Sequence, residues 1–184
     1  YSGNIIRSTD NGSSWDNVTS PTANDLWEVT FGNNTFVAVG LSGNIVRSTD
    51  NGSSFDNVTS GTDQHLYGVT YGNNTFVAVG KGGKIFTSSD GTTWNSRTSG
   101  TSEFLRGFTY ANSTFVISGD SGTILTSSDG TTWTERTSGT SNNLWRVNYA
   151  NSSFVTVGDN GTILTSSDGT SWTERTSGTS NNLW

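Results

Sequence analysis

Cysteine and methionine are both absent from the sequence, and histidine occurs once. The absence of cysteine excludes disulfides, thiolate metal ligands and thiol nucleophiles together. No apolar run exceeds a few residues, so no segment is long enough to span a bilayer. Lysine and arginine number nine against fifteen acidic residues, which gives a net charge of −6. Because nucleic-acid binders carry clustered basic residues, we expect no nucleic-acid partner and no membrane insertion.

Apolar residues are also scarce, at only 29% of the chain, and proline occurs once. Low hydrophobicity alone is typical of disorder. The sequence nevertheless contains seven Trp, five Tyr and nine Phe residues, spaced at regular intervals. Since disordered chains are poor in aromatic residues, we expect a β-rich domain that packs through its rings. The composition, rich in Ser, Thr and Asn and poor in Lys, favours a secreted or cell-surface protein.

A motif of the form Ser-x-Asp followed by Gly recurs along the chain every 39 or 40 residues. Its five aspartates, and the aromatic residue that follows each of them, are Asp10, Asp50, Asp90, Asp129 and Asp168 with Trp15, Phe55, Trp94, Trp133 and Trp172. A second anchor with the same spacing begins at Leu26-Trp27 and returns for the last time at Leu183-Trp184. A period of this length indicates a repeat architecture.

Each repeat contains four short segments with the composition of β-strands. In one copy they are residues 144–149, 153–157, 162–166 and 172–176, separated by turn sequences rich in Gly, Asn and Asp. No helical periodicity occurs anywhere. Four strands in a unit of about forty residues are typical of a propeller blade. We therefore predict an all-β fold, a β-propeller of four-stranded antiparallel blades.

The predicted organisation is a single propeller region over residues 1–184. It consists of the outer hairpin of an incomplete blade (1–25), full repeats (26–65, 66–104, 105–143 and 144–182) and the start of another blade (183–184). Tyr1 falls in mid-pattern, so we expect an upstream segment. Five motifs with four inner hairpins favour a window on a longer array of about six to eight blades. The alternatives are a five-bladed ring closed by strands from both ends, and chains that complete one another by oligomerising, because open strand edges invite pairing.

The motif Ser-x-Asp-x-Gly-x-x-Trp resembles the Asp-box of sialidase-type (BNR) repeats. The wider pattern of Ser-Gly-Thr, Leu-Trp/Tyr-x-Val and Val-Gly-x-x-Gly-x-Ile is similar to the photosystem II assembly and stability factor type of propeller, over essentially the whole chain. In Asp-box families the carboxylate accepts hydrogen bonds across its own turn, between the third and fourth strands, and the aromatic residue packs between blades. The resemblance implies that the five aspartates and their aromatic partners are structural, and we predict neither a metal site nor a cofactor.

Catalytic groups are hard to assemble from this sequence. Sialidases bind a carboxylate with three arginines, whereas only Arg106 and Arg146 lie on predicted inner strands. His65 lacks a convincing partner for a triad or a metal site. A glycosidase needs two carboxylates a fixed short distance apart, and the acidic residues expected at the channel end are Asp25, Glu28, Asp63, Glu103, Asp120 and Asp159. We therefore predict a protein that is not an enzyme.

One face of the propeller is expected to carry both the inter-blade loops and the turns between second and third strands. This face varies most between repeats, and its ligand-binding candidates are Trp27, Tyr67, Arg106, Trp145, His65, Asp120 and Asp159. Aromatic rings beside polar groups are typical of glycan sites. The alternative interpretation is that these rings only pack between blades.

These observations predict a non-catalytic propeller that serves as a structural or protein-interaction module, with a protein partner or self-association. The alternative is a multivalent lectin with one aromatic and polar site per blade, in which linked weak sites act together. A sialidase-like glycoside hydrolase is less favoured. A role in photosystem assembly follows from the family likeness alone.

Overall fold

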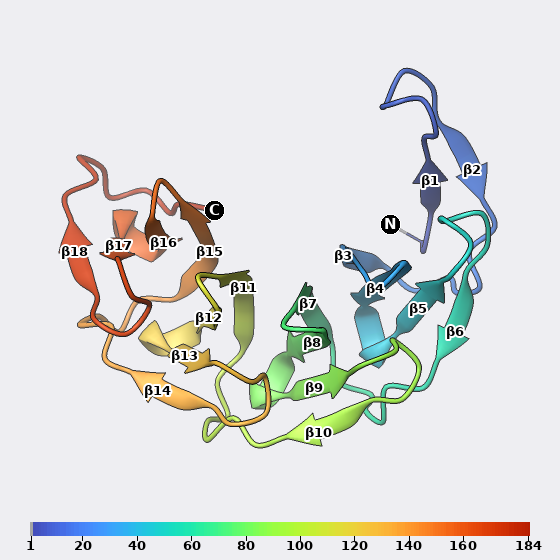
Figure 1. Cartoon of the computed structure of the whole chain (residues 1–184). Helices are drawn as coiled ribbons and strands as arrows, with labels where there is room; N and C mark the ends of the chain where they lie inside the picture. Colours follow the sequence, from blue (N-terminus) through green and yellow to red (C-terminus); the bar gives the residue numbers. More distant parts are fainter. Residues whose placement is uncertain (1) are drawn as a thin grey trace.

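The computed structural model describes residues 2–184, so Tyr1, the predicted mid-pattern start, lies outside the described residues. Within that range, eighteen strands form five antiparallel sheets, four with four strands and one with two. The sheets stand side by side as blades in an open arc, with the two-stranded sheet at one end (Figure 1). The structure confirms the predicted all-β propeller of four-stranded antiparallel blades.

Strands within each full blade are hydrogen-bonded in chain order, so the first strand lies on the concave side of the arc and the fourth on its outside (Figure 1). The first blade comprises β3 (Leu26–Gly32), β4 (Thr35–Gly40), β5 (Ile45–Ser48) and β6 (Asp56–Val58). The second comprises β7 (Leu66–Gly72), β8 (Thr75–Gly80), β9 (Ile85–Ser88) and β10 (Asn95–Arg97). The third comprises β11 (Leu105–Ala111), β12 (Thr114–Gly119), β13 (Ile124–Ser127) and β14 (Thr134–Arg136). The fourth comprises β15 (Leu144–Ala150), β16 (Ser153–Gly158), β17 (Ile163–Ser166) and β18 (Thr173–Arg175). The two-stranded sheet pairs β1 (Ile5–Arg7) with β2 (Asp16–Val18).

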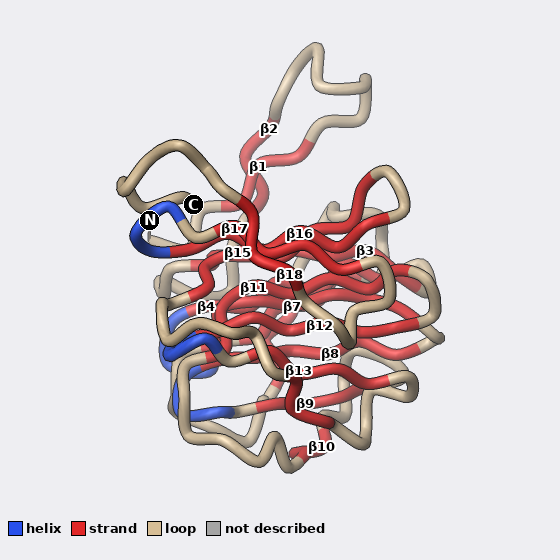
Figure 2. The backbone as a smooth tube through the Cα atoms, turned by 90° about the vertical axis from the view of Figure 1, so that its left-hand side faces the viewer, coloured by secondary structure: helices blue, strands red, loops and turns tan. Residues whose placement is uncertain are grey.

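Two kinds of turn close each blade. The inner hairpins turn through two residues with positive φ, such as Asn33 (47°) and Asn34 (54°), a backbone that Asn adopts readily and that matches the twist of the strands. The second and third strands are joined by 3₁₀ turns, η1 (Leu41–Gly43), η2 (Lys81–Gly83), η3 (Asp120–Gly122) and η4 (Asp159–Gly161). Figure 2 shows these four turns together on one side of the molecule. The sequence predicts a turn at each of these places but not its helical form.

The apolar core lies between the blades rather than inside any one of them. Between the first two blades, Val37 and Val39 of β4 pack on Leu66, Val69 and Phe76. Two further clusters of the same kind join the second blade to the third and the third to the fourth. Each fully buried side chain of this size contributes about 1.5–3 kcal/mol. A single blade cannot bury its faces alone, so the blades stabilise one another in order along the chain.

Candidate functional site

One residue per blade lines the concave side of the arc, which we call the channel. Each is the second residue of an innermost strand, and they are Trp27, Tyr67, Arg106 and Trp145. The pairing register shifts across each of them, for example between Leu26 and Glu28. Such a β-bulge leaves one residue unpaired and re-aims its side chain. The repeat therefore presents one variable side chain per blade at equivalent places along the channel.

The structure brings these side chains together into one continuous row, which we call the aromatic row. Trp27 and Tyr67 stack with ring centroids 5.3 Å apart and planes 18° apart. At the other end, the rings of Trp145 and Trp184 lie 4.6 Å apart. The Arg106 guanidinium joins the two pairs, 5.5 Å from the Tyr67 centroid and 4.2 Å from that of Trp145. Cation–π attraction of this kind stabilises the arrangement. The candidate residues of adjacent blades thus contact one another and are not separated from blade to blade.

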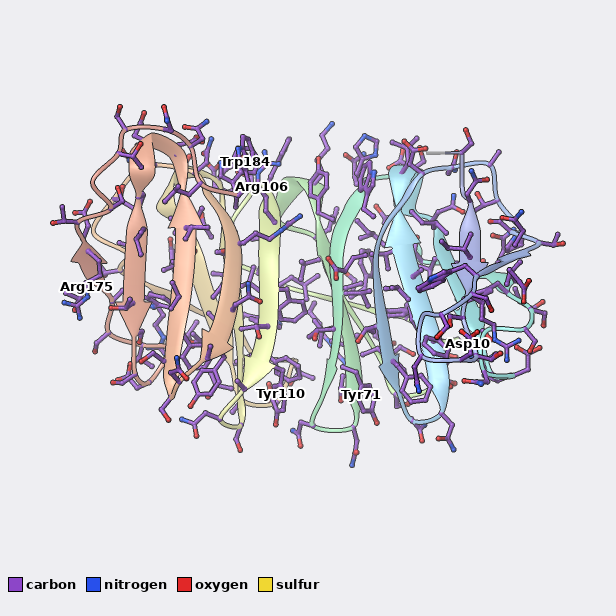
Figure 3. The ribbon with its side chains drawn as sticks, turned by 90° about the horizontal axis from the view of Figure 1, so that it is seen from above. Asp10, Tyr71, Arg106, Tyr110, Arg175 and Trp184 are labelled. Atoms are coloured by element: carbon purple, nitrogen blue, oxygen red, sulfur yellow. The ribbon has the colours of Figure 1, made fainter. Side chains whose placement is uncertain are left out.

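The aromatic row encloses a pocket that opens at one edge of the arc. The pocket has a volume of about 340 Å³, and its lining residues are Trp27, Tyr67, Arg106, Trp145, Arg146 and Trp184. Trp27 is 39% exposed and Trp184 is 74% exposed. Figure 3 shows Arg106 and Trp184 at one edge and Tyr71 and Tyr110 at the opposite edge. The rings do contact one another across blades, but they also present accessible surface around a cavity.

Two acidic residues of the 3₁₀ turns, Asp120 and Asp159, accept hydrogen bonds from side chains of the aromatic row. Asp120 forms a bidentate pair with Arg106, in which Nε donates to Oδ1 and Nη2 donates to Oδ2 at 2.9 Å. The indole Nε1 of Trp145 donates to Oδ1 of Asp159 at 2.7 Å. Bidentate, charge-assisted hydrogen bonds fix both distance and orientation. Asp120 and Asp159, both predicted site residues, therefore position the row and have fewer oxygen lone pairs left for a ligand.

His65 lies behind the row, in the loop between the first two blades. Its ring meets that of Trp27 edge-on at 5.6 Å, and its Nδ1 accepts a hydrogen bond from the backbone N–H of Ser42 at 3.1 Å. Asn143 makes the equivalent contact two repeats along, where its Oδ1 accepts from the N–H of Ser121 at 3.0 Å. His65 thus makes a contact that recurs between blades, in which a side chain of the inter-blade loop accepts a hydrogen bond from the backbone of a 3₁₀ turn.

A pair of opposite charges lies one residue further along the inner strands. Glu28 and Arg146 occupy equivalent positions on β3 and β15, while the two strands between them carry Gly68 and Gly107. The surrounding protein raises the pKa of Glu28, although its side chain is accessible from the channel, and the charge of Arg146 opposes that rise. Sequence reasoning did not place Arg146 or Trp184 in the site, although Trp184 repeats the Leu-Trp anchor and so carried a signal.

The comparisons with known proteins bear on the fold. No protein-family model matches the sequence, and neither does any curated protein. The fold is similar to that of YCF48. A structure of YCF48 bound to D1 peptide is 19% identical with a TM-score of 0.72, over 95% of this chain and 60% of that chain. YCF48 from Cyanidioschyzon merolae is 16% identical with a TM-score of 0.68, over 94% of this chain and 65% of that chain.

A computationally designed protein, Ika4, is also similar, with 14% identity and a TM-score of 0.64, over 78% of this chain and 91% of that chain. The present chain spans less than two thirds of the length of the two YCF48 chains. At these identities the likeness shows a shared propeller fold. What the chain binds must therefore be argued from its own site.

The five predicted aspartates lie in the turns between third and fourth strands. Asp129 is representative, since its Oδ1 accepts hydrogen bonds from the N–H groups of Thr131 (2.7 Å) and Thr132 (2.8 Å) and from the Ser127 hydroxyl (2.9 Å). Corresponding serine and backbone hydrogen bonds recur at Asp10, Asp50, Asp90 and Asp168. These bonds lower the pKa of all five carboxyls, and at Asp10, where Ser14 contributes most, the pKa falls to about 2.

The aromatic residues of these turns differ in burial. The Nε1–H groups of Trp94, Trp133 and Trp172 each donate to the carbonyl of the turn glycine, at 3.1–3.2 Å, and their rings pack against the inter-blade clusters. Phe55 is half-buried, and Trp15 is 58% exposed. Trp15 therefore departs from the predicted packing between blades, because its hairpin has no inner strands beside it.

Most acidic residues expected at the channel end are engaged within the chain. Besides Asp120 and Asp159, an oxygen of Asp25 accepts from the Ser2 N–H, one of Asp63 from the Gln64 side chain, and one of Glu103 from the Ser121 hydroxyl. Within residues 2–184, no three His, Asp or Glu side chains are grouped so that they could hold a metal ion. No helix in the same range is long and apolar enough to cross a membrane.

Proposed function

We propose that the chain is a protein-interaction propeller that binds an extended polypeptide segment across the aromatic row. The observation that carries this proposal is the set of accessible rings around a pocket of about 340 Å³ with Arg106 among them. Trp, Tyr and Arg are the side chains most enriched where protein–protein contacts contribute most energy. The YCF48 structure bound to D1 peptide supports the idea that this fold accommodates a peptide.

The physical arrangement of the row suits such a ligand. Its rings are already stacked and its arginine is already paired, so few side chains lose freedom on binding. The Nη1 group of Arg106 has no hydrogen-bond acceptor among the described residues and points to a ligand carbonyl or carboxylate as its partner. Glu28 and Arg146 place opposite charges at the two sides of the channel, which would orient a polypeptide that carries complementary charges.

The proposal also covers the role of the aspartate turns, the location of the protein and the absence of catalysis. The five aspartate turns are assigned to the Asp-box type and serve the fold, supported by their repeated serine and backbone hydrogen bonds. A secreted or cell-surface location is supported by the Ser-, Thr- and Asn-rich composition without cysteine. A role without catalysis is supported by the hydrogen bonds that occupy the carboxylates near the channel.

Glycan binding is the second candidate, favoured by the accessible face of Trp27 beside polar loop residues. The stacking of Trp27 on Tyr67 covers ring faces that separate sugar sites would use, so a lectin of this geometry would hold a single extended glycan. Both candidate ligands would use the same accessible row, and they are distinguished by whether the chain selects peptides or binds glycans.

The test begins with peptides selected for binding to the folded chain by display of a random library. Their affinity is then measured by calorimetry for the wild type, Trp145→Ala, and Trp15→Ala, a control that removes an exposed indole outside the row. Loss of a hot-spot ring costs at least about 2 kcal/mol, so Trp145→Ala should weaken binding about thirtyfold and Trp15→Ala should not. A glycan array is probed with the same three proteins. Glycan binding lost only in Trp145→Ala, with no peptide selected, would replace the peptide proposal with a lectin.

A further inference from the structure

Glu28 differs from the other acidic residues at the channel end, because its carboxylate has no hydrogen-bond donor and no ion-pair partner among the described residues. The other five each accept a hydrogen bond within the chain, and they are Asp25, Asp63, Glu103, Asp120 and Asp159. An ionised carboxylate has about four lone-pair sites for donors. The full hydrogen-bonding capacity of Glu28 is therefore free for a ligand.

The strand pairing places the Glu28 side chain on the face of β3 that packs towards the second blade. Glu28 lies directly opposite Val39 on β4, and the side chains of directly opposed residues lie on the same face of a sheet. Val39 packs between the first and second blades, in the same cluster as Leu66 of β7. The lack of a partner for Glu28 therefore belongs to an interface in which both blades have all four strands.

The surroundings of Glu28 remove part of its hydration without replacing it. The side chain is exposed to the channel, yet burial by the nearby protein raises the pKa of its carboxyl, and the charge of Arg146 opposes this rise. In the five aspartate turns, by contrast, hydrogen bonds lower the pKa of each carboxyl. A partly desolvated carboxylate without donors is unfavourable, and a cationic group beside it would remove this cost.

A basic side chain is the cation that fits the position of Glu28. A metal ion such as Ca²⁺ takes about six to eight oxygen ligands. Within residues 2–184, no group of three His, Asp or Glu side chains could supply them. A Lys ammonium or an Arg guanidinium, by contrast, forms charge-assisted hydrogen bonds with a single carboxylate. The next two inner strands carry Gly68 and Gly107 at this place, so neither adds a side chain to the channel beside Glu28.

We propose that Glu28 selects a Lys or Arg side chain in the polypeptide that binds across the aromatic row. The inference rests on the proposed function, because Glu28 directly follows Trp27, the ring of the first blade in the row. Arg146 lines the pocket beside Trp145 of the fourth blade and repels a basic side chain. The basic residue of the ligand therefore lies near Trp27, which fixes how the polypeptide is placed along the row.

A displayed library of random heptapeptides tests this selectivity. It is selected separately against the folded full chain and three folded variants, which are Glu28→Gln, Glu28→Lys and Glu135→Gln, a control that removes the same charge from the exposed strand β14. We expect Lys and Arg to be enriched about threefold over the unselected library in peptides bound by the wild type and by Glu135→Gln. Glu28→Gln should still select peptides but lose this enrichment. Glu28→Lys should enrich Asp and Glu instead, because like charges repel.

Calorimetry with one selected peptide adds a double-mutant cycle. At low salt, replacing the basic residue of the peptide by Gln should weaken binding to the wild type about fivefold and leave binding to Glu28→Gln unchanged. Equal weakening in both chains, or equal Lys and Arg content in the peptides that the two chains select, would overturn the role of Glu28 and leave peptide binding at the row intact. If the folded wild type selects no peptide at all, this inference and the proposed function both fail.

Discussion

At the scale of single residues, a glycine in each 3₁₀ turn fixes the path of the chain between blades. Gly122 has φ of 73°, and a Cβ at this position would lie 2.0 Å from the Thr140 carbonyl oxygen. Gly82, in the neighbouring turn, has φ of 67° but no heavy atom within 4 Å of an added Cβ. Position 122 therefore cannot accommodate a side chain. Position 82 can accommodate one, and the equivalent residue of the first blade is Ser42.

Gly122→Ala should lower the free energy of unfolding by at least about 2 kcal/mol, from the positive φ together with the backbone clash. Gly82→Asn, the matched control, should change it by less than about 1 kcal/mol, because Asn tolerates this backbone. Urea denaturation measures both. Equal losses in the two variants would show that the clash is not the cause.

The aspartate turns predict an acid-sensitive fold. A carboxyl in the unfolded chain has a pKa of about 3.9, and hydrogen bonds hold the pKa of all five lower in the fold, to about 2 for Asp10. Each turn therefore adds stability that is full above about pH 5 and is lost as the pH falls towards 2. The melting temperature should fall across this range. Asp129→Asn should melt lower at pH 7 and depend less on pH, whereas an unchanged slope would contradict the assignment.

Residue identities and spacing located the aspartate turns and placed Trp27, Tyr67, Arg106 and Trp145 at equivalent positions, while their part in binding stays a prediction. The turn contacts lie within five residues of one another, so the local pattern contains them. The merging of the rings into one row was not predictable, because it depends on the distance between blades. The bidentate pair of Arg106 with Asp120 depends on the β-bulge, which alternation of residue types does not reveal.

At the scale of strands and blades, equivalent positions have different burial according to their place in the arc. Phe115 on β12 is fully buried between two blades, beside Tyr110 and Trp133. Phe36 on β4 is only half-buried, because it lines a cavity of about 460 Å³ between the first blade and the β1–β2 hairpin. The same residue in the same repeat position thus contributes differently to stability.

Phe115→Ala should lower the free energy of unfolding by about 3–5 kcal/mol, the usual loss for a large buried ring. Phe36→Ala should cost clearly less, since its ring already contacts solvent. Chemical denaturation of the two variants gives the comparison. Equal losses would contradict the difference in burial between the two rings.

Strand order and turn positions followed from the repeat at this scale, because Gly, Asn and Asp mark each turn in every copy. The bulge in each innermost strand did not follow, since one unpaired residue leaves the alternation on either side intact. That bulge decides which side chain enters the channel.

At the scale of the whole molecule, the strands of different blades that pack closely within residues 2–184 belong to neighbouring blades, so stability is approximately a sum of blade and interface contributions. The β1–β2 hairpin has two strands and one neighbour, and isolated two-stranded sheets are marginally stable. The number of blades needed to close a ring depends on the angle between blades, which is a property of packing rather than of composition. The closure alternatives drawn from the sequence therefore stay predictions.

This gradient of stability should appear in native-state hydrogen exchange. Amides of Ile5–Arg7 should exchange at least about tenfold faster than those of Ile124–Thr126, which lie in a four-stranded blade with neighbours on both sides. Uniform protection along the chain would contradict the description of independent, nearest-neighbour blades.

The proposed polypeptide site at the aromatic row can be located directly by the seven tryptophan indole N–H signals in a two-dimensional NMR spectrum. Trp27, Trp145 and Trp184 line the row, whereas Trp94, Trp133 and Trp172 donate within their own turns. On titration with a selected peptide, the first three signals should shift to saturation and the last three should stay in place. Shifts confined to the turn indoles, or no shift at saturating peptide, would contradict binding at the aromatic row.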